Sequence, residues 1–149
     1  MARILVRDDD LVVRLSWWEK AAAQRGSVRV PLAAVRRVTV ESDWWRALRG
    51  VARHGVWIPD VLSIGTRGHA DGQDFVAVRP GRPVVCVELR PTAPFGLLAV
   101  SVRDDAQATA QRLRRSAPDI DVSTPWRQPL PVAEETKDSW RELDMYEHH

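Results

Sequence analysis

Residues 61–116 decide the fold: VLSIGTRG (61–68), HADGQ (69–73), DFVAVRPGRPVVCVEL (74–89), RPTAPFG (90–96), LLAVSV (97–102) and RDDAQATAQRLRRS (103–116). Apolar runs with many β-branched residues are separated by turns rich in Gly, Pro and Asp. Apolar alternation with a period of two is typical of β-strands. We therefore expect a meander of four strands, closed by one helix that begins near Asp104 and Asp105 and ends before Pro118.

The same patterns predict the core. One face of each later strand is apolar, and the helix carries a narrow apolar stripe at spacings of three and four residues. We expect one buried cluster that contains Val85, Val87, Leu89, Leu98, Val100 and Leu113.

The N-terminal part of the chain predicts three more strands. They cover residues 4–7, 11–17 and 28–41, the last interrupted by a 3₁₀ turn or kink at 32–35. Trp17 and Trp18 would prolong the second strand, with their indoles on opposite faces. Residues 19–25 are interpreted as a helix or a long turn.

A short helical turn is predicted over residues 44–49. Asp43 suits its N-cap, and Gly50 suits the position after its last residue. Gly55 and Pro59 favour a loop over residues 51–60, VARHGVWIPD. Seven strands and one helix result.

Composition and charge predict one domain with a tail. Residues 1–116 carry 19 Arg or Lys and 12 Asp or Glu, a net charge of +7. Residues 117–149 carry 3 and 8, a net charge of −5, and are rich in proline. The boundaries are therefore 1–116 for the domain and 117–149 for an acidic tail. We expect the tail to lie over the basic surface of its own domain or of a second copy, with Trp126 as an anchor. The alternative is a disordered tail.

The single cysteine and the absence of long apolar runs indicate the compartment. Cys86 excludes an intramolecular disulfide and a multi-cysteine metal site. We find neither a signal-peptide pattern nor a stretch of membrane-spanning length. The expectation is a cytoplasmic protein.

Seven short strands followed by one helix is the order of the pleckstrin-homology fold. The run WWRALRGVARHGVWIPDVLSIGT resembles a bacterial family of small pleckstrin-homology-like proteins of unknown function. The match is carried by Trp45, Arg49, Gly50, Gly55, Ile58, Pro59, Gly65 and Thr66, and Asp60 departs from the glycine usual there. The resemblance implies a mainly β fold: a partly open barrel of two near-orthogonal antiparallel sheets, with about seven strands and a helix cap. It implies no activity.

Catalytic, metal and cofactor signals are weak. There is no Gly-x-Ser-x-Gly elbow and no glycine-rich phosphate loop. His54 and His69 lack metal-ligand spacing, and we interpret His69 as a solvated turn residue. Cys86, flanked by valines, is interpreted as a small buried hydrophobic residue. We expect no catalytic site, no metal and no cofactor.

The densest basic segment is a candidate surface for an anion or a partner. It contains Arg46, Arg49, Arg53 and His54, next to Trp44 and Trp45. Arginine beside tryptophan is typical of binding surfaces. We prefer the interpretation as a packed loop, whose arginines extend along apolar surface with their charged ends in water.

The predicted function is a non-catalytic binding or scaffolding module with a protein partner. A peripheral membrane or anion-binding role is the alternative, and an enzyme is the least favoured class. Asp8, Asp9 and Asp10 occupy the first hairpin loop, where they would repel a phosphoinositide head group. No recognition helix or single-strand platform for nucleic acid is evident. Self-association through the tail stays open.

Overall fold

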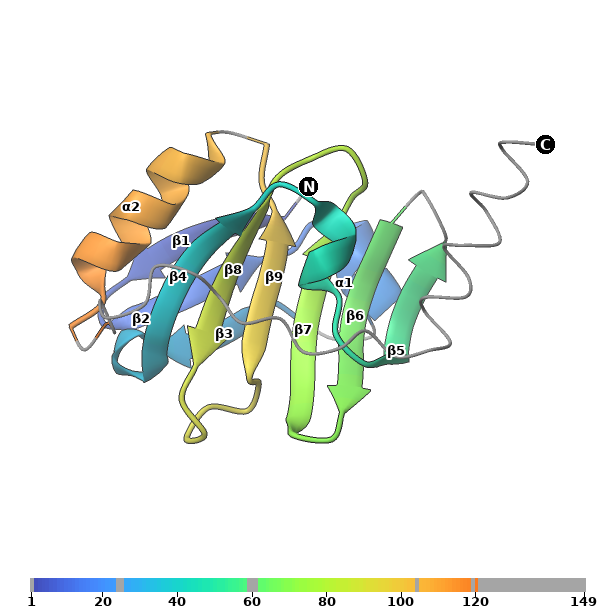
Figure 1. Ribbon diagram of the computed structural model, residues 1–149, viewed down its shortest axis with the longest axis horizontal. Coiled ribbons are helices and arrows are strands. Elements are labelled where there is room, and N and C mark those ends of the chain that lie inside the picture. The colour runs from blue at the N-terminus through green and yellow to red at the C-terminus, as the bar shows by residue number, and fades with distance from the viewer. Residues whose placement is uncertain (1, 24–25, 59–61, 104, 119, 121–149) are drawn as a thin grey trace.

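The computed structural model describes residues 2–23, 26–58, 62–103, 105–118 and 120 (Figure 1). The strands are β1 (Arg3–Arg7), β2 (Asp10–Arg14), β3 (Val28–Pro31), β4 (Val35–Glu41), β5 (Val51–Ile58), β6 (Leu62–His69), β7 (Gly72–Val78), β8 (Val84–Leu89) and β9 (Leu97–Ser101). The helices are α1 (Trp17–Ala23), the 3₁₀ turns η1 (Leu32–Ala34) and η2 (Trp44–Ala47), and α2 (Ala106–Ser116). Most of these bounds lie within a few residues of those predicted.

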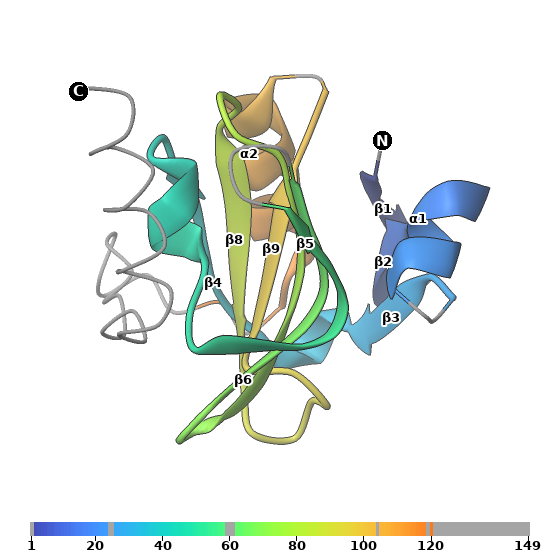
Figure 2. The same ribbon diagram turned by 90° about the vertical axis from the view of Figure 1, so that its right-hand side faces the viewer.

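The strands form two sheets. A three-stranded antiparallel sheet has the order β1-β2-β3, and a six-stranded sheet has the order β4-β8-β9-β7-β6-β5. The three-stranded sheet lies on one side of the larger sheet, and η2 lies on the other side (Figure 2). The fold is mainly β with one C-terminal helix, as predicted, but the sheets do not close into a barrel. The described residues form nine strands, where about seven were expected.

The predicted meander is wrong at its last strand. β9 lies between β7 and β8, antiparallel to β8 but parallel to β7, with Phe75 opposite Leu98. All five residues of β9 are buried. A strand without a polar face is typical of the centre of a sheet, where both faces are covered. The apolar sequence of β9 predicts its burial but not which strands pair with it. The predicted order, with each strand antiparallel to the one before it, was therefore wrong.

The predicted loop at residues 51–60 is mostly strand β5, which ends at Ile58. Gly55 does not break the strand, because it pairs with Gly65 of β6. A Cβ built on either glycine would lie about 2 Å from a backbone oxygen of the opposite strand. The two backbones therefore approach more closely here than side chains allow, and this is a known use of glycine inside strands.

Trp17 and Trp18 begin a helix rather than prolonging a strand. Ser16 precedes α1, and its backbone N–H and hydroxyl both donate to Oε1 of Glu19, at 3.0 and 2.8 Å. This is half of a capping box, whose S-x-x-E signature stands in the sequence at 16–19. Trp17 is 82% exposed, whereas Trp18 packs, partly buried, against the main core.

The main core lies between the two sheets and under α2. All six residues of the predicted cluster belong to it, so that prediction is confirmed. Helix α2 packs on β4 and β8 and also contacts β1. It therefore covers one end of the inner face of the six-stranded sheet and does not plug a barrel. Asp105 caps the helix by accepting from the N–H groups of Gln107 and Ala108.

A second, smaller cluster lies on the outer face of the six-stranded sheet. It contains Ala47, Leu48, Val76, Val78, Val84, Cys86, Leu97 and Ala99. Cys86 is fully buried, as predicted. The predictions for the tail beyond residue 120, including the anchor Trp126, lie outside the described residues.

Candidate functional site

The segment from Asp43 to Gly50 lies over the outer face of the six-stranded sheet. Ala47 and Leu48 are fully buried there against β7, β8 and β9. Asp43 occupies the N-cap position of η2, as predicted, but its side chain makes no cap bond. It forms an ion pair with Arg46 instead, with Nε to Oδ2 at 3.5 Å. Apolar burial fixes the middle of the segment, and polar contacts fix its end.

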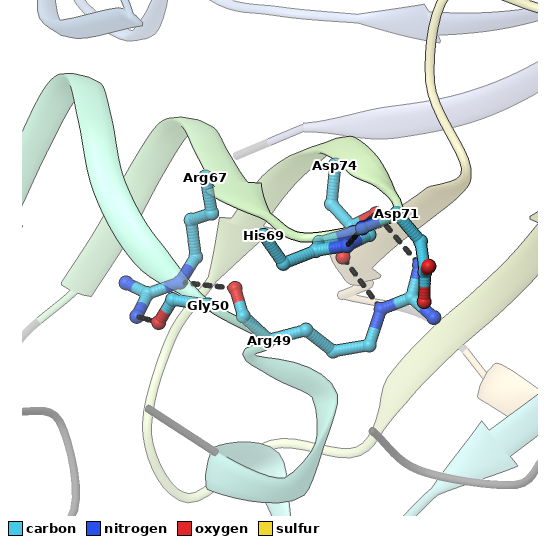
Figure 3. A network of polar contacts seen from close by, with 6 residues as sticks. All are labelled: Arg49, Gly50, Arg67, His69, Asp71 and Asp74. Carbon is cyan, nitrogen blue, oxygen red and sulfur yellow. Dashed lines mark hydrogen bonds and ion pairs between the residues drawn. The ribbon is translucent and has the colours of Figure 1, made fainter. Parts of the chain in front are cut away.

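Arg49 and Asp74 form a buried, two-pronged ion pair (Figure 3). Nε and Nη2 of Arg49 donate to Oδ2 and Oδ1 of Asp74 at 2.6 and 2.7 Å. The Asp74 side chain is 0% exposed and that of Arg49 is 10% exposed. Such a geometry is among the strongest hydrogen-bonding arrangements in proteins, since both partners are charged and both bonds are aligned. It ties the end of the η2 segment to β7.

His69 joins the same carboxylate. Its Nε2 lies 3.0 Å from Oδ1 of Asp74, and its Nδ1 accepts the backbone N–H of Asp71 at 3.2 Å. Because Nδ1 accepts, the ring hydrogen is on Nε2, which donates to Asp74. The His69 side chain is only 8% exposed, so the prediction of a solvated turn residue is wrong. The two-residue loop at 70–71 folds back and turns the ring inward.

Arg67 completes the network from β6. Its Nη2 donates to the carbonyl of Gly50 at 2.8 Å, and its Nε donates to the carbonyl of Arg49 at 3.2 Å. Arg67 is 1% exposed and lies opposite Asp74 in the sheet. A buried cation needs partners of this kind, because desolvation is costly. Its guanidinium therefore fixes the backbone at the end of the η2 segment.

Gly50 permits the close approach of this segment to β6. Its φ is +68°, and a Cβ there would lie 2.0 Å from the carbonyl oxygen of Gly68. The helical turn predicted over residues 44–49 ends at Ala47 with Leu48 as its C-cap, so Gly50 does not directly follow the turn as predicted, although its backbone is left-handed. Any other residue would push the segment away from the sheet and lengthen the Arg67 hydrogen bonds.

The predicted surface residues separate into buried and exposed groups. Arg49 is buried in the ion pair, and Trp44 packs partly buried against the outer cluster. Trp45 is 42% exposed, and the Arg46 guanidinium carbon lies 5.2 Å from its ring centroid. We call these two side chains the Trp45–Arg46 platform. Of these two neighbouring tryptophans, Trp44 is therefore the inner one and Trp45 the outer one.

Arg53 and His54 are exposed on β5, on the far side of Gly50 along the chain. The Arg53 side chain crosses Gly68, since a Cβ on that glycine would lie 2.6 Å from the Arg53 Nε. The fold brings four of the six predicted residues to the surface. Whether they bind a ligand stays a prediction.

Sequence reasoning missed Asp74, Arg67 and His69 as one network. One signal was available: a two-residue loop after His69 places Arg67 directly opposite Asp74, and opposite charges facing each other across strands stabilise a hairpin. The ion pair between Arg49 and Asp74 joins residues 25 positions apart, and no local sequence pattern predicts it.

Within the described part of the chain, no three His, Cys, Asp or Glu side chains are arranged to hold a metal ion. No helix of that same part is long and apolar enough to cross a membrane.

The chain was compared with models of protein families, with curated proteins and with solved structures. None of the three comparisons finds a match. The resemblance to bacterial pleckstrin-homology-like proteins therefore stays a prediction.

Proposed function

We propose that this chain is a non-catalytic binding module that presents the Trp45–Arg46 platform to a protein partner. The observation that carries the proposal is a contrast within eight residues. The ion pair of Arg49 with Asp74 holds the end of the η2 segment against the sheet, yet Trp45 of the same segment is 42% exposed.

The residue types of the platform support a protein partner. Tryptophan and arginine are enriched among the residues that contribute most to protein–protein affinity. Arg46 lies beside the Trp45 ring, so the two side chains offer one flat amphipathic surface. A rigid base lowers the entropy that binding costs, because the segment is already ordered in the free protein.

The polar network itself favours a structural role over catalysis. Asp74 accepts two bonds from Arg49 and one from His69, and both ring nitrogens of His69 are engaged. A general base needs a nitrogen that can reach a substrate proton. We therefore infer that the network positions the platform and does not act on a substrate.

The test places a photo-crosslinking amino acid at position 45 of the full chain, in cells that express it. Position 17 is the matched control, because Trp17 is also an exposed tryptophan, is 82% exposed and lies on α1, which packs on the inner side of β5 and β6. We expect a discrete crosslinked protein from position 45 and none from position 17. Equal products from both positions would contradict the proposal.

The partner identified in this way then permits an affinity measurement. Trp45→Ala should weaken its binding about thirtyfold, since loss of a central interface tryptophan typically costs about 2 kcal/mol or more. Trp17→Ala should leave the dissociation constant unchanged. Unchanged affinity in Trp45→Ala, with an unchanged melting temperature, would overturn the assignment of the platform.

The exposure of Trp17 is the observation that favours the alternative, a peripheral membrane role. Exposed tryptophan suits the membrane–water interface. Sedimentation with vesicles that contain anionic lipid, lost in Trp17→Ser and at high salt, would favour this second function. Loss of this sedimentation in Trp45→Ala would show that the Trp45–Arg46 platform binds the membrane.

A further inference from the structure

The structure has a pocket between β1, the end of β9 and helix α2. Its volume is about 300 Å³, and it is lined by Ala2, Arg3, Ile4, Leu5, Val102, Arg103, Thr109 and Arg112. β1, which forms one wall of the pocket, lies on the inner side of the six-stranded sheet, whereas η2 lies on the outer side (Figure 2). The pocket is therefore a separate place on the molecule.

Three arginines from separate parts of the chain line this pocket. Arg3 belongs to β1, Arg103 follows β9, and Arg112 belongs to α2. All three are exposed. None forms an ion pair with another described residue, and the lining residues in the described ranges include no carboxylate.

Asp105 is the described acidic residue nearest to Arg103 in the sequence, and its side chain already caps helix α2. Both bonds accepted by the Asp105 side chain come from the first turn of α2. Asp104, next to Arg103 in the chain, lies outside the described residues.

The floor of the pocket is different from its rim. Ile4 and Val102 are 4% and 7% exposed, and Thr109 is 6% exposed. Two buried apolar side chains, one buried threonine and three exposed arginines therefore line the same pocket. Polar groups that line one pocket can fix the orientation of a small ligand.

The backbone of β1 also faces the pocket. Residues 2 to 5 are consecutive, yet all four line it. Alternate side chains of a strand point to opposite faces, so four neighbours can line one pocket only along the strand edge. β1 is the outer strand of the three-stranded sheet, and its second edge pairs with no strand in the described part of the chain.

We propose that this pocket binds a phosphate group of a small phosphorylated molecule. Guanidinium groups form paired hydrogen bonds to phosphate oxygens, and three of them match an anion that carries more than one charge. A carboxylate would leave most of this positive charge uncompensated. The volume fits a compact ligand whose apolar part contacts the floor while its phosphate lies among the arginines.

The experiment titrates the full chain with inorganic pyrophosphate in a calorimeter. We expect saturable binding that weakens as salt rises. Arg112→Gln and Arg3→Gln should each weaken it about tenfold, the usual effect of losing a hydrogen bond to a charged group. Arg115→Gln is the matched control, because Arg115 is an exposed arginine on the same helix and does not line the pocket. Its affinity should stay within about twofold of the parent.

A second arm distinguishes free phosphates from lipid head groups. Vesicles of phosphatidylcholine with and without phosphatidic acid are sedimented with the parent and with Arg112→Gln. Pyrophosphate binding without sedimentation assigns a soluble ligand. Sedimentation that needs both phosphatidic acid and Arg112 assigns a lipid head group. Absence of binding in both arms, or an equal loss in Arg115→Gln, would overturn the proposal.

Discussion

The two faces of the six-stranded sheet are buried by different means. The inner face is packed by aliphatic and aromatic side chains against β1–β3 and α2. The outer face combines a small apolar cluster with the ion pair between Arg49 and Asp74. Apolar burial tolerates some change of shape, whereas a buried ion pair requires both partners in place. Both faces therefore contribute to stability, and the outer face in addition fixes the position of the η2 segment.

The largest expected effect breaks the outer face. Asp74→Ala leaves the Arg49 guanidinium buried without its anion, and removal of one partner of a buried pair typically costs about 3–5 kcal/mol. The free energy of unfolding, measured by urea titration, should fall by that amount.

Asp71→Ala is the control for this prediction. Asp71 is exposed and contacts His69 through its backbone N–H, which alanine retains. Its unfolding free energy should change by no more than about 0.5 kcal/mol. An equal, small effect of both substitutions would mean that the ion pair does not stabilise the outer face.

The next effect tests the inner face. Leu113 is 1% exposed and packs from α2 into the main core, so Leu113→Ala should cost about 2–5 kcal/mol. Gln111→Ala, at an exposed position of the same helix, should be nearly neutral. An unchanged melting temperature in Leu113→Ala would show that α2 does not belong to the core.

Hydrogen exchange can sharpen the contrast between these two variants. Asp74→Ala should raise exchange first at the backbone of residues 44–50, because their anchor is lost. Leu113→Ala should raise it across β4 and β8, on which α2 packs. The same pattern in both variants would mean that the two faces unfold as one unit.

The smallest effect concerns the start of α2. Asp105→Ala removes the acceptor for two N–H groups and should cost about 1 kcal/mol. Asp105→Asn keeps a capping oxygen and should retain most of the stability. The melting temperatures of the parent, Asp105→Asn and Asp105→Ala check this order of stability. If Asp105→Asn is as unstable as Asp105→Ala, the charge rather than the cap matters.

Local features of the fold could be predicted where one pattern sufficed. Alternation located β8 and β9, and the acidic start and basic end located α2. The kink at 32–35 proved to be η1, because Pro31 limits the strand before it. Two local predictions failed although signals existed: the S-x-x-E box announced α1, and Gly55 faces a second glycine instead of ending a strand.

The candidate site was predictable in part for the same reason. Trp45 and Arg46 are neighbours in the sequence, so their joint exposure needed only local reasoning. The ion pair that fixes them joins Arg49 to Asp74 across the sheet, and the pocket arginines come from separate parts of the chain. Such groupings depend on which strands become neighbours.

The sequence by itself determined most of the strands, the terminal helix and six residues of the inner core. Period, capping chemistry and apolar content act over a few residues, so they can be read without a fold. Only the tertiary structure decided that β9 lies parallel to β7, that the His69 ring turns inward and that Arg3, Arg103 and Arg112 line one pocket. These outcomes depend on contacts between residues that are distant in the sequence, and such contacts form only when other elements pack on both faces of the sheet.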